Sequence, residues 1–216
     1  SYVDVGVVGA VFAAPYAFLP IAVGFFSQRV GHFKPYAIGV AGCGLSAVAL
    51  LWADTIPSVI ATRVVGGVAY AFLWPMAEAM IAEMTDWDVR AAAMGMFSLS
   101  WGVAFSLGPA LGGFVAQLLG FKALFAISSA VIAFALALTL LRVRESKGWE
   151  LVGSEWRALP AIREAVDVYV AIAVYGASMG LVFVLWPAQV HEAGVSTGVV
   201  GLVLAVIGVT RLGMFA

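Results

Sequence analysis

The sequence predicts an all-α integral membrane fold, a bundle of about seven transmembrane helices, and three observations lead to it. Hydrophobic residues make up 63% of the 216 residues and the mean hydropathy is +1.06, whereas soluble domains are roughly 45 to 50% apolar. Mainly apolar stretches long enough to cross a bilayer, about 20 residues each, recur along the whole chain. Charged residues make up only 11% of the chain and gather in the connections between these stretches.

The apolar stretches define the expected membrane spans, which are residues 4–27, 36–53, 57–82, 92–118, 122–141, 166–189 and 197–216. The chain has no initiator Met, and its last span is cut short without a polar tail, so we expect a fragment. Prolines inside the spans remove backbone donors and predict kinks; they are Pro15, Pro20, Pro75, Pro109 and Pro187.

The cations predict the orientation of the bundle, because short cytoplasmic loops of membrane proteins carry an excess of Lys and Arg. Eight of the 11 cations fall in alternate connections on one side: Arg29, Lys34, Arg90, Arg142, Arg144, Lys147, Arg157 and Arg163. Lys122 stands alone on the other side. We therefore expect the loops 28–35, 83–91 and 142–165 to be cytoplasmic and Ser1 to be extracytoplasmic.

The longest polar connection divides the chain into three parts. Residues 1–143 hold five spans, 144–165 form a linker, and 166–216 hold two spans. Apolar residues of the linker recur every three or four positions after Ser154, which favours an amphipathic helix on the inner membrane surface. A loosely ordered linker is the alternative, because Gly148, Gly153 and Pro160 interrupt the pattern.

Three charged residues lie deep inside the expected spans, where a charge costs about 2.5 to 3.5 kcal/mol on insertion scales. Arg63 is a candidate for proton relay or substrate orientation, or else a structural donor to carbonyls of a neighbouring helix. Glu78 either binds protons or pairs with a cation on a helix outside this chain, and Arg211 is a third candidate.

The composition argues against other functional classes. The net charge of −1 offers no basic surface for nucleic acid. His32 and His191 fall in loops on opposite sides of the membrane, and Cys43 is a single cysteine in an apolar run, so neither a metal site nor a disulfide is expected. Asp86 and Asp88 lack a third catalytic partner. The sequence predicts no enzyme and no cofactor.

Aromatic residues inside the spans are lipid-facing or packing residues by default. Those of the third and fourth spans can instead line a cavity for an apolar substrate, and periodicity does not choose between lipid and lumen. The residues concerned are Tyr16, Tyr70, Phe72, Trp74, Trp101, Phe105 and Trp186.

The stretch "VGFFSQRVGHFK" and three motifs further along resemble the major facilitator superfamily of secondary transporters. The inner loop of that family reads G-x-x-x-D-R-x-G-R-[KR], and the matching residues here are Gly24, Arg29, Gly31 and Lys34. Gln28 stands in place of the acid and His32 in place of the second Arg. By the resemblance these residues form a conformational gate, with Glu83 or Asp86 as the expected acidic partner of Arg29.

The other motifs belong to the third to fifth spans. "RVVGGVAYAFLWPMAEAMIAE" supplies the family's helix-four pattern with Arg63, Gly66, Gly67, Pro75 and Glu83. "GVAFSLGPALGG" is an intact antiporter motif, with Gly102, Gly108, Pro109, Gly112 and Gly113. "GFKALF" resembles the start of the family's next helix. The seven spans then correspond to helices two to eight of a twelve-helix bundle.

The resemblance implies alternating access by two rocking helix bundles, in a multi-pass protein of the cell membrane that is monomeric by family habit. The antiporter motif implies a close-packed face that limits leak, and so a proton-driven exporter of small, apolar or drug-like molecules, with no cofactor. The alternatives are a proton-coupled importer of a metabolite or organic anion, with Arg63 binding substrate charge, a non-transporting sensor or inactive remnant, and a membrane enzyme.

Overall fold

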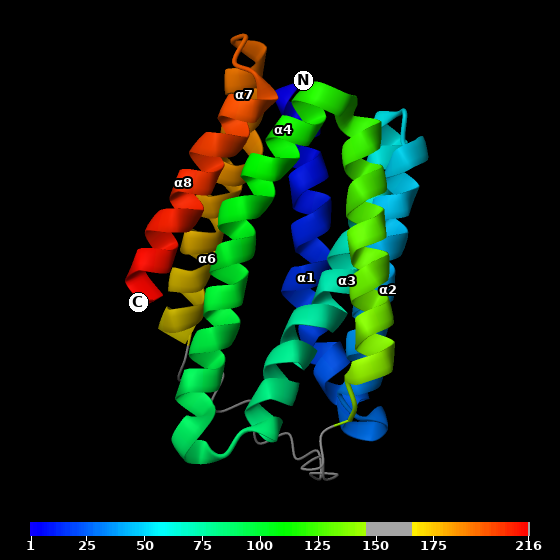
Figure 1. Cartoon of the computed structure of the whole chain (residues 1–216), viewed down its shortest axis with the longest axis vertical. Helices are drawn as coiled ribbons and strands as arrows, with labels where there is room; N and C mark the ends of the chain where they lie inside the picture. Colours follow the sequence, from blue (N-terminus) through cyan, green and yellow to red (C-terminus); the bar gives the residue numbers. More distant parts are fainter. Residues whose placement is uncertain (146–165, 216) are drawn as a thin grey trace.

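The computed structural model describes residues 1–145 and 166–215. All regular elements in this part of the chain are helical: α1 (Tyr2–Val30), α2 (Phe33–Ala49), η1 (Leu50–Trp52), α3 (Ile56–Met84), α4 (Trp87–Arg142), α6 (Val166–Gly180), η2 (Leu181–Leu185), α7 (Trp186–Glu192) and α8 (Thr197–Phe215). Each predicted span overlaps one or more of these helices, which Figure 1 shows in their arrangement. The predicted surface helix after Ser154 lies outside the described residues.

Helix α4 is two antiparallel arms rather than one rod. A straight helix of 56 residues would be about 84 Å long, far more than a bilayer core of about 30 Å. Gly120 interrupts it with φ 82° and ψ 167°, a conformation that glycine adopts without steric strain. The chain turns back there (Figure 1), and the break falls between the predicted spans 92–118 and 122–141.

Helix α3 packs between α1 and α2 through small residues. Gly39 of α2 lies so close to α3 that an added Cβ would be 2.7 Å from the backbone nitrogen of Leu73. Gly67 of α3 lies against the backbone of Phe12 in α1. Because lipid provides no hydrophobic drive between helices, such close backbone approach supplies the packing contacts that hold them together.

The outer surface of the bundle is apolar. Phe18 is 77% exposed and Leu118 is 75% exposed, while the fully buried positions include small residues such as Ala69 and Ala71. Four helices, namely α1, α2 with η1, α3 and α4, have the length and composition to cross a membrane among the described residues. Helices that pack in lipid are expected to have apolar side chains on the outer surface of the bundle and small residues at the contacts between helices.

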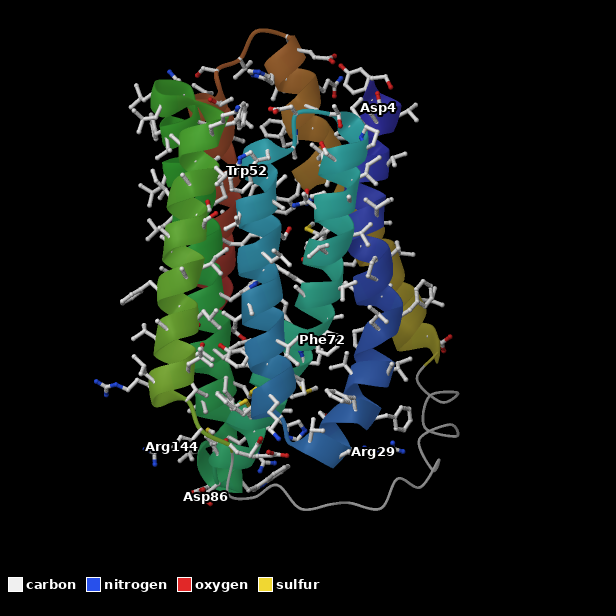
Figure 2. The ribbon with its side chains drawn as sticks, turned by 90° about the vertical axis from the view of Figure 1, so that its right-hand side faces the viewer. Asp4, Arg29, Trp52, Phe72, Asp86 and Arg144 are labelled. Atoms are coloured by element: carbon white, nitrogen blue, oxygen red, sulfur yellow. The ribbon has the colours of Figure 1, made fainter. Side chains whose placement is uncertain are left out.

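The connections sort to the two ends of the bundle as the charge pattern predicts. Figure 2 shows Arg29, Asp86 and Arg144 at one end and Asp4 and Trp52 at the other. The loops 28–35 and 83–91 and the start of the linker therefore share one end, which is called the loop end below. The Nζ of Lys122 lies 3.8 Å from Oδ1 of Asp54. Asp54 belongs to the connection between η1 and α3, which is away from the loop end.

Candidate functional site

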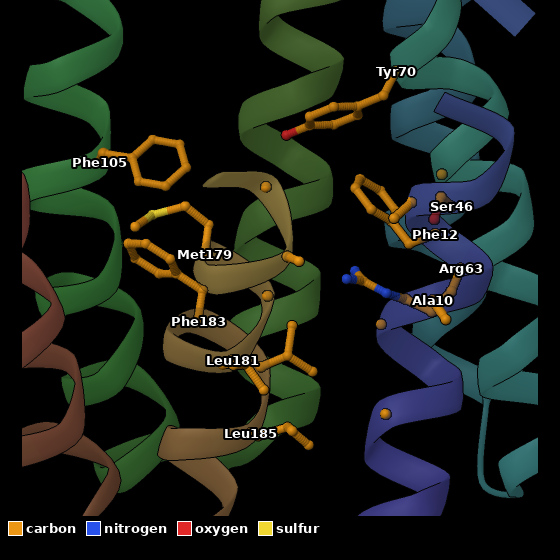
Figure 3. Close-up of a pocket in the computed structure, with 18 of the residues that line it drawn as sticks. Ala10, Phe12, Ser46, Arg63, Tyr70, Phe105, Met179, Leu181, Phe183 and Leu185 are labelled. Atoms are coloured by element: carbon orange, nitrogen blue, oxygen red, sulfur yellow. The ribbon is translucent and has the colours of Figure 1, made fainter. Parts of the chain in front are cut away.

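A cavity of about 1310 Å³ lies within the bundle. It is bordered by α1, α2, α3, both arms of α4, and the run of α6 and η2. Its wall is mainly apolar, and the larger side chains among the lining residues are Phe12, Leu50, Arg63, Tyr70, Trp101, Phe105, Ile132, Tyr175, Met179, Leu181, Phe183 and Leu185. Figure 3 shows Tyr70 and Arg63 on one side and Phe105, Met179 and Phe183 on the facing side.

Arg63 is the only charged residue among the described residues that line this cavity. Its guanidinium carbon lies 4.5 Å from the centroid of the Phe12 ring, a cation–π contact. Its Nε is buried and has no hydrogen-bond partner within the described chain. The side chain points into the cavity (Figure 3). A buried N–H without an acceptor is costly unless a ligand or water accepts its hydrogen bond.

A chain of aromatic contacts crosses the cavity from α1 to η2. Ring centroids are 5.0 Å apart for Phe12 and Tyr70, 4.3 Å apart for Trp101 and Phe105, and 5.9 Å apart for Phe105 and Phe183. Trp74 links the two groups, 6.2 Å from Tyr70 and 6.0 Å from Trp101. The aromatic rings that the sequence left undecided between lipid and lumen thus include three that line the cavity: Tyr70, Trp101 and Phe105.

The π-helical turn η2 places Phe183 on the cavity wall. Pro187 follows in the first turn of α7 and has no N–H to donate to the carbonyl four residues back, at Phe183. The N–H of Trp186 donates instead to the carbonyl of Leu181, five residues back. The kink predicted at Pro187 therefore takes the form of a π-bulge, a feature frequent at functional sites.

A second polar cluster lies at the loop end, around the turn between α1 and α2. Gly31 ends α1 with φ 86°, and its N–H donates to the carbonyl of Ser27. The carboxylate of Glu145 accepts the N–H of His32 at 2.9 Å and that of Phe33 at 3.2 Å. The Nδ1 of His32 lies 3.1 Å from Oε2 of Glu83. These contacts tie the α1–α2 turn to α3 and to the segment after α4.

This cluster differs from the arrangement that the sequence led us to expect. The sequence led us to expect Arg29 beside Glu83, and the structure places His32 there; Arg29 is exposed, as are Lys34 and Asp86. Gln28 is half-buried, and a Cβ at Gly24 would meet nothing within 4 Å. The acid that lies on Gly31 is Glu145, which the sequence did not single out because it sits in a polar stretch 113 positions away from His32.

The antiporter-like motif of α4 packs on α8. A Cβ at Gly113 would lie 2.5 Å from the carbonyl oxygen of Thr197, and Gly201 lies against the carbonyl of Pro109. The hydroxyl of Thr197 donates to the carbonyl of Gly113 at 3.2 Å.

Further along the same face, Ser106 is buried and lies against Gly208, and the hydroxyl of Ser106 donates to the carbonyl of Gly102. Gly112 makes only ordinary contact, with Leu124, and Gly108 meets no atom within 4 Å. The close packing expected of the motif is therefore observed at Gly113 and Pro109 but not at Gly108.

The other two ionisable candidates do not join Arg63. Glu78 lies on the same helix, 15 positions further along, is exposed, and does not line the cavity. Arg211 lies in α8, and its side chain falls outside the described residues. The sequence also missed Phe12 and Phe183 as wall residues, since an apolar residue facing lipid and one facing a cavity give the same pattern.

The sequence of this chain is similar to the sequences of known transport and resistance proteins. The chain is similar to multidrug resistance protein 1 of Bacillus subtilis (28% identity over 141 residues, 65% of this chain and 36% of the relative). It is also similar to the tetracenomycin C resistance and export protein of Streptomyces glaucescens (26% identity, 59% of this chain and 24% of the relative). The chain thus spans about a third or less of the length of these relatives.

A solved structure has the same fold. The crystal structure of a D-xylose-proton symporter matches 98% of this chain and 55% of its own, with a TM-score of 0.67 and 19% identity. The model of the family described as "Major Facilitator Superfamily" matches residues 1–216. With an all-helical bundle, a central cavity and a match over its whole length, this chain belongs to the Major Facilitator Superfamily.

Proposed function

We propose that the whole protein is a secondary transporter that exports small, largely apolar molecules in exchange for protons by alternating access. The observation that carries this proposal is the aromatic cavity of about 1310 Å³ inside the bundle. Ligand sites usually measure about 300 to 1,000 Å³, so the cavity has room for a drug-sized molecule. The names of the relatives, which include resistance and export proteins, favour export.

The close packing of α4 on α8 supports coupled exchange of substrate for protons, because it limits uncoupled passage of protons between the two helices. We take α4 to belong to the first half of a twelve-helix bundle and α8 to the second, as the sequence resemblance implies, so that their contact joins the two halves. Gly113 and Gly201 bring the two backbones so close together that neither position has room for a Cβ. A seal of this kind is what coupled exchange requires, because an open path would dissipate the proton gradient.

We assign the loop end to the cytoplasm and the Ser1 end to the outside. The cations of the loop end support this orientation, since Arg29, Lys34 and Arg90 all belong to its connections. The contacts of Glu145 and Glu83 with the α1–α2 turn then form an inner gate. We take the protein to act as a monomer in the lipid of the cell membrane, with the proton as coupling ion.

Arg63 and Glu78 have different places in this proposal. Arg63 faces the cavity, and we assign it a role in coupling substrate binding to proton movement. Glu78 lies outside the cavity wall, and in the whole protein it is a candidate for pairing with a cation of another helix. Proton-coupled import of an organic anion is the second candidate function, favoured by the charge of Arg63.

Flux in reconstituted vesicles tests the proposal. The full-length protein is placed in proteoliposomes with an acidic interior, and uptake of radiolabelled chloramphenicol, a small neutral aromatic compound, is followed. Exchange for protons predicts accumulation that stops when nigericin removes the pH gradient. Accumulation only when the outside is the acidic side would indicate symport and import. Uptake that is the same with and without a gradient would reject proton coupling.

A further inference from the structure

The polar groups of the cavity are unbalanced in charge. Arg63 supplies the one cation among the described lining residues, and none of these residues carries a carboxylate. The other polar groups on its wall are neutral, such as Ser46, Tyr70 and Tyr175. Ser46 is already engaged, since its hydroxyl donates to the carbonyl of Thr62 at 2.8 Å.

The carboxylates of α1, α2 and α3 do not neutralise Arg63 either. Glu78 is 15 residues along α3, which places it about 22 Å away along the helix axis. Asp4 of α1 is held by the amino group of Ser1 at 2.9 Å. Helix α2 has no acidic residue. Within the described chain the guanidinium therefore lacks a counter-ion, and its Nε lacks any acceptor.

The surroundings of Arg63 favour an anion of a particular kind. Phe12 covers one side of the guanidinium at 4.5 Å, and the side chain extends into the open cavity (Figure 3). A guanidinium presents paired N–H donors that match the two oxygens of a carboxylate. Around this single cation the wall is aromatic, with Tyr70, Trp101, Phe105 and Phe183 in one connected series of rings.

We propose that the preferred substrates of this transporter are aromatic monoanions, with the carboxylate bound by Arg63 and the ring system held among the aromatic side chains. One cation matches one negative charge, and a cationic compound would place like charges together in an apolar cavity. This inference rests on the proposed function, because it takes the cavity to be the transport site. It sets the substrate apart from the neutral and cationic compounds that an aromatic cavity alone would accept.

Tyr70 is placed to contribute to the same site. It lies seven residues after Arg63 on α3, and therefore on the same face of the helix at about 10 Å along the axis. Its hydroxyl points into the cavity (Figure 3). A substrate with its carboxylate at Arg63 thus has a second hydrogen-bonding group available at the opposite end of its ring system.

A matched set of three naphthalene compounds tests the proposal by isothermal titration calorimetry on the purified full-length protein. The compounds are 1-naphthoate, neutral 1-naphthamide and 1-naphthylmethylammonium. We expect naphthoate to bind at least about tenfold more tightly than naphthamide, and the ammonium compound to bind most weakly. Equal binding of the three, tightest binding of the ammonium compound, or no measurable binding of naphthoate would overturn the proposal.

Variants locate the effect at Arg63. In R63M the preference for naphthoate over naphthamide falls to within about twofold, while R63K, which keeps the charge but loses the paired donors, retains part of it. R142M is the control, because Arg142 is exposed at the end of α4, and it should bind as the unmodified protein does. An unchanged preference in R63M would place the anion elsewhere and overturn the assignment.

Flux separates this inference from the proposed function. Naphthoate binding that depends on Arg63, without gradient-driven movement of any probe, would support the anion site and reject transport. Gradient-driven movement of chloramphenicol without a preference for naphthoate would support transport and reject the anion site.

Discussion

The imidazole Nδ1 of His32 lies 3.1 Å from Oε2 of Glu83, a contact that joins the turn between α1 and α2 to the last turn of α3. Glu145 approaches the same turn from the segment after α4 and accepts two of its N–H groups. Three parts of the chain thus meet at the loop end through two carboxylates. If this end opens during transport, these contacts must break.

We expect E145Q to loosen the loop end. Glu145 satisfies the N–H groups at the start of α2, where a negative charge also interacts favourably with the helix dipole. Loss of that charge should lower the stability of the closed loop end, relative to the open one, by about 1 kcal/mol. The measurement is the alkylation rate of Cys43, a cavity-lining residue, with a reagent added from the loop end.

An increase of about fivefold in alkylation rate would correspond to this loss. The control is E192Q, which changes an exposed glutamate at the end of α7 and should leave the rate unchanged. If E145Q and E192Q give the same rate, the contact of Glu145 plays no part in closing this end.

Two glycines of the antiporter-like motif should respond differently to the same change. In G113A the new Cβ would meet the carbonyl oxygen of Thr197 at 2.5 Å, so α4 and α8 must separate. Such overpacking costs about 1 to 3 kcal/mol. In G108A the new Cβ meets nothing within 4 Å, and replacing a helical glycine should stabilise the protein by about 0.5 to 1 kcal/mol.

Thermal unfolding in detergent, followed by tryptophan fluorescence, measures both variants. The G113A midpoint should fall and the G108A midpoint should stay the same or rise. Proteoliposomes with G113A should also lose an imposed pH gradient faster than those with G108A. The reverse order of stability would show that α4 and α8 are not held together at Gly113.

Much of the fold could be predicted from the sequence because lipid restricts the possibilities. A membrane-crossing segment must be a long apolar helix, so spans such as 57–82 were visible as composition alone. The break at Gly120 was visible as a short connection between apolar runs, and the shared end of the 28–35 and 83–91 loops followed from their cations.

The site was only partly predictable, for reasons of geometry. Arg63 stood out because a charge inside a span is rare. Phe12 and Phe183 did not stand out, because whether they face the cavity or the lipid depends on the rotation of α1 and η2 about their axes. A nearly uniform apolar sequence does not indicate that rotation. Glu145 was missed because its contacts with His32 and Phe33 form only when the second arm of α4 returns to the loop end. Such a tertiary contact is not visible in the sequence.

The π-bulge at η2 should disappear in P187A. Alanine restores an N–H that can donate to the carbonyl of Phe183, which favours a regular helix through Leu181–Leu185. A change from five-residue to four-residue hydrogen bonds in this stretch rotates the preceding helix relative to α7 by about 100°, so Met179 should turn away from the cavity and Phe183 should shift. We expect a more stable protein that binds aromatic ligands more weakly.

Ligand titration and thermal unfolding check the P187A prediction together. P20A is the matched control, because Pro20 also lies inside a helix, α1, but does not line the cavity. Weaker binding of 1-naphthamide in P187A with unchanged binding in P20A would support the role of the bulge. Unchanged binding in both would show that Phe183 contributes little.

Trp101 connects the two halves of the aromatic series and should carry much of the affinity for apolar rings. It lies 4.3 Å from Phe105 and 6.0 Å from Trp74, measured between ring centroids. In W101A both contacts are lost, and each aromatic pair contributes about 0.5 to 1.5 kcal/mol beyond its buried area. Binding of 1-naphthamide should weaken by about tenfold, which corresponds to about 1.4 kcal/mol. W52A is the control, since Trp52 is 71% exposed in η1, at the end of the bundle away from the loop end. Because naphthamide is neutral, the loss in W101A should be independent of Arg63, and the effects of W101A and R63M on naphthoate should then add. A combined loss much smaller than the sum would mean that ring and carboxylate are not bound at separate places in one cavity.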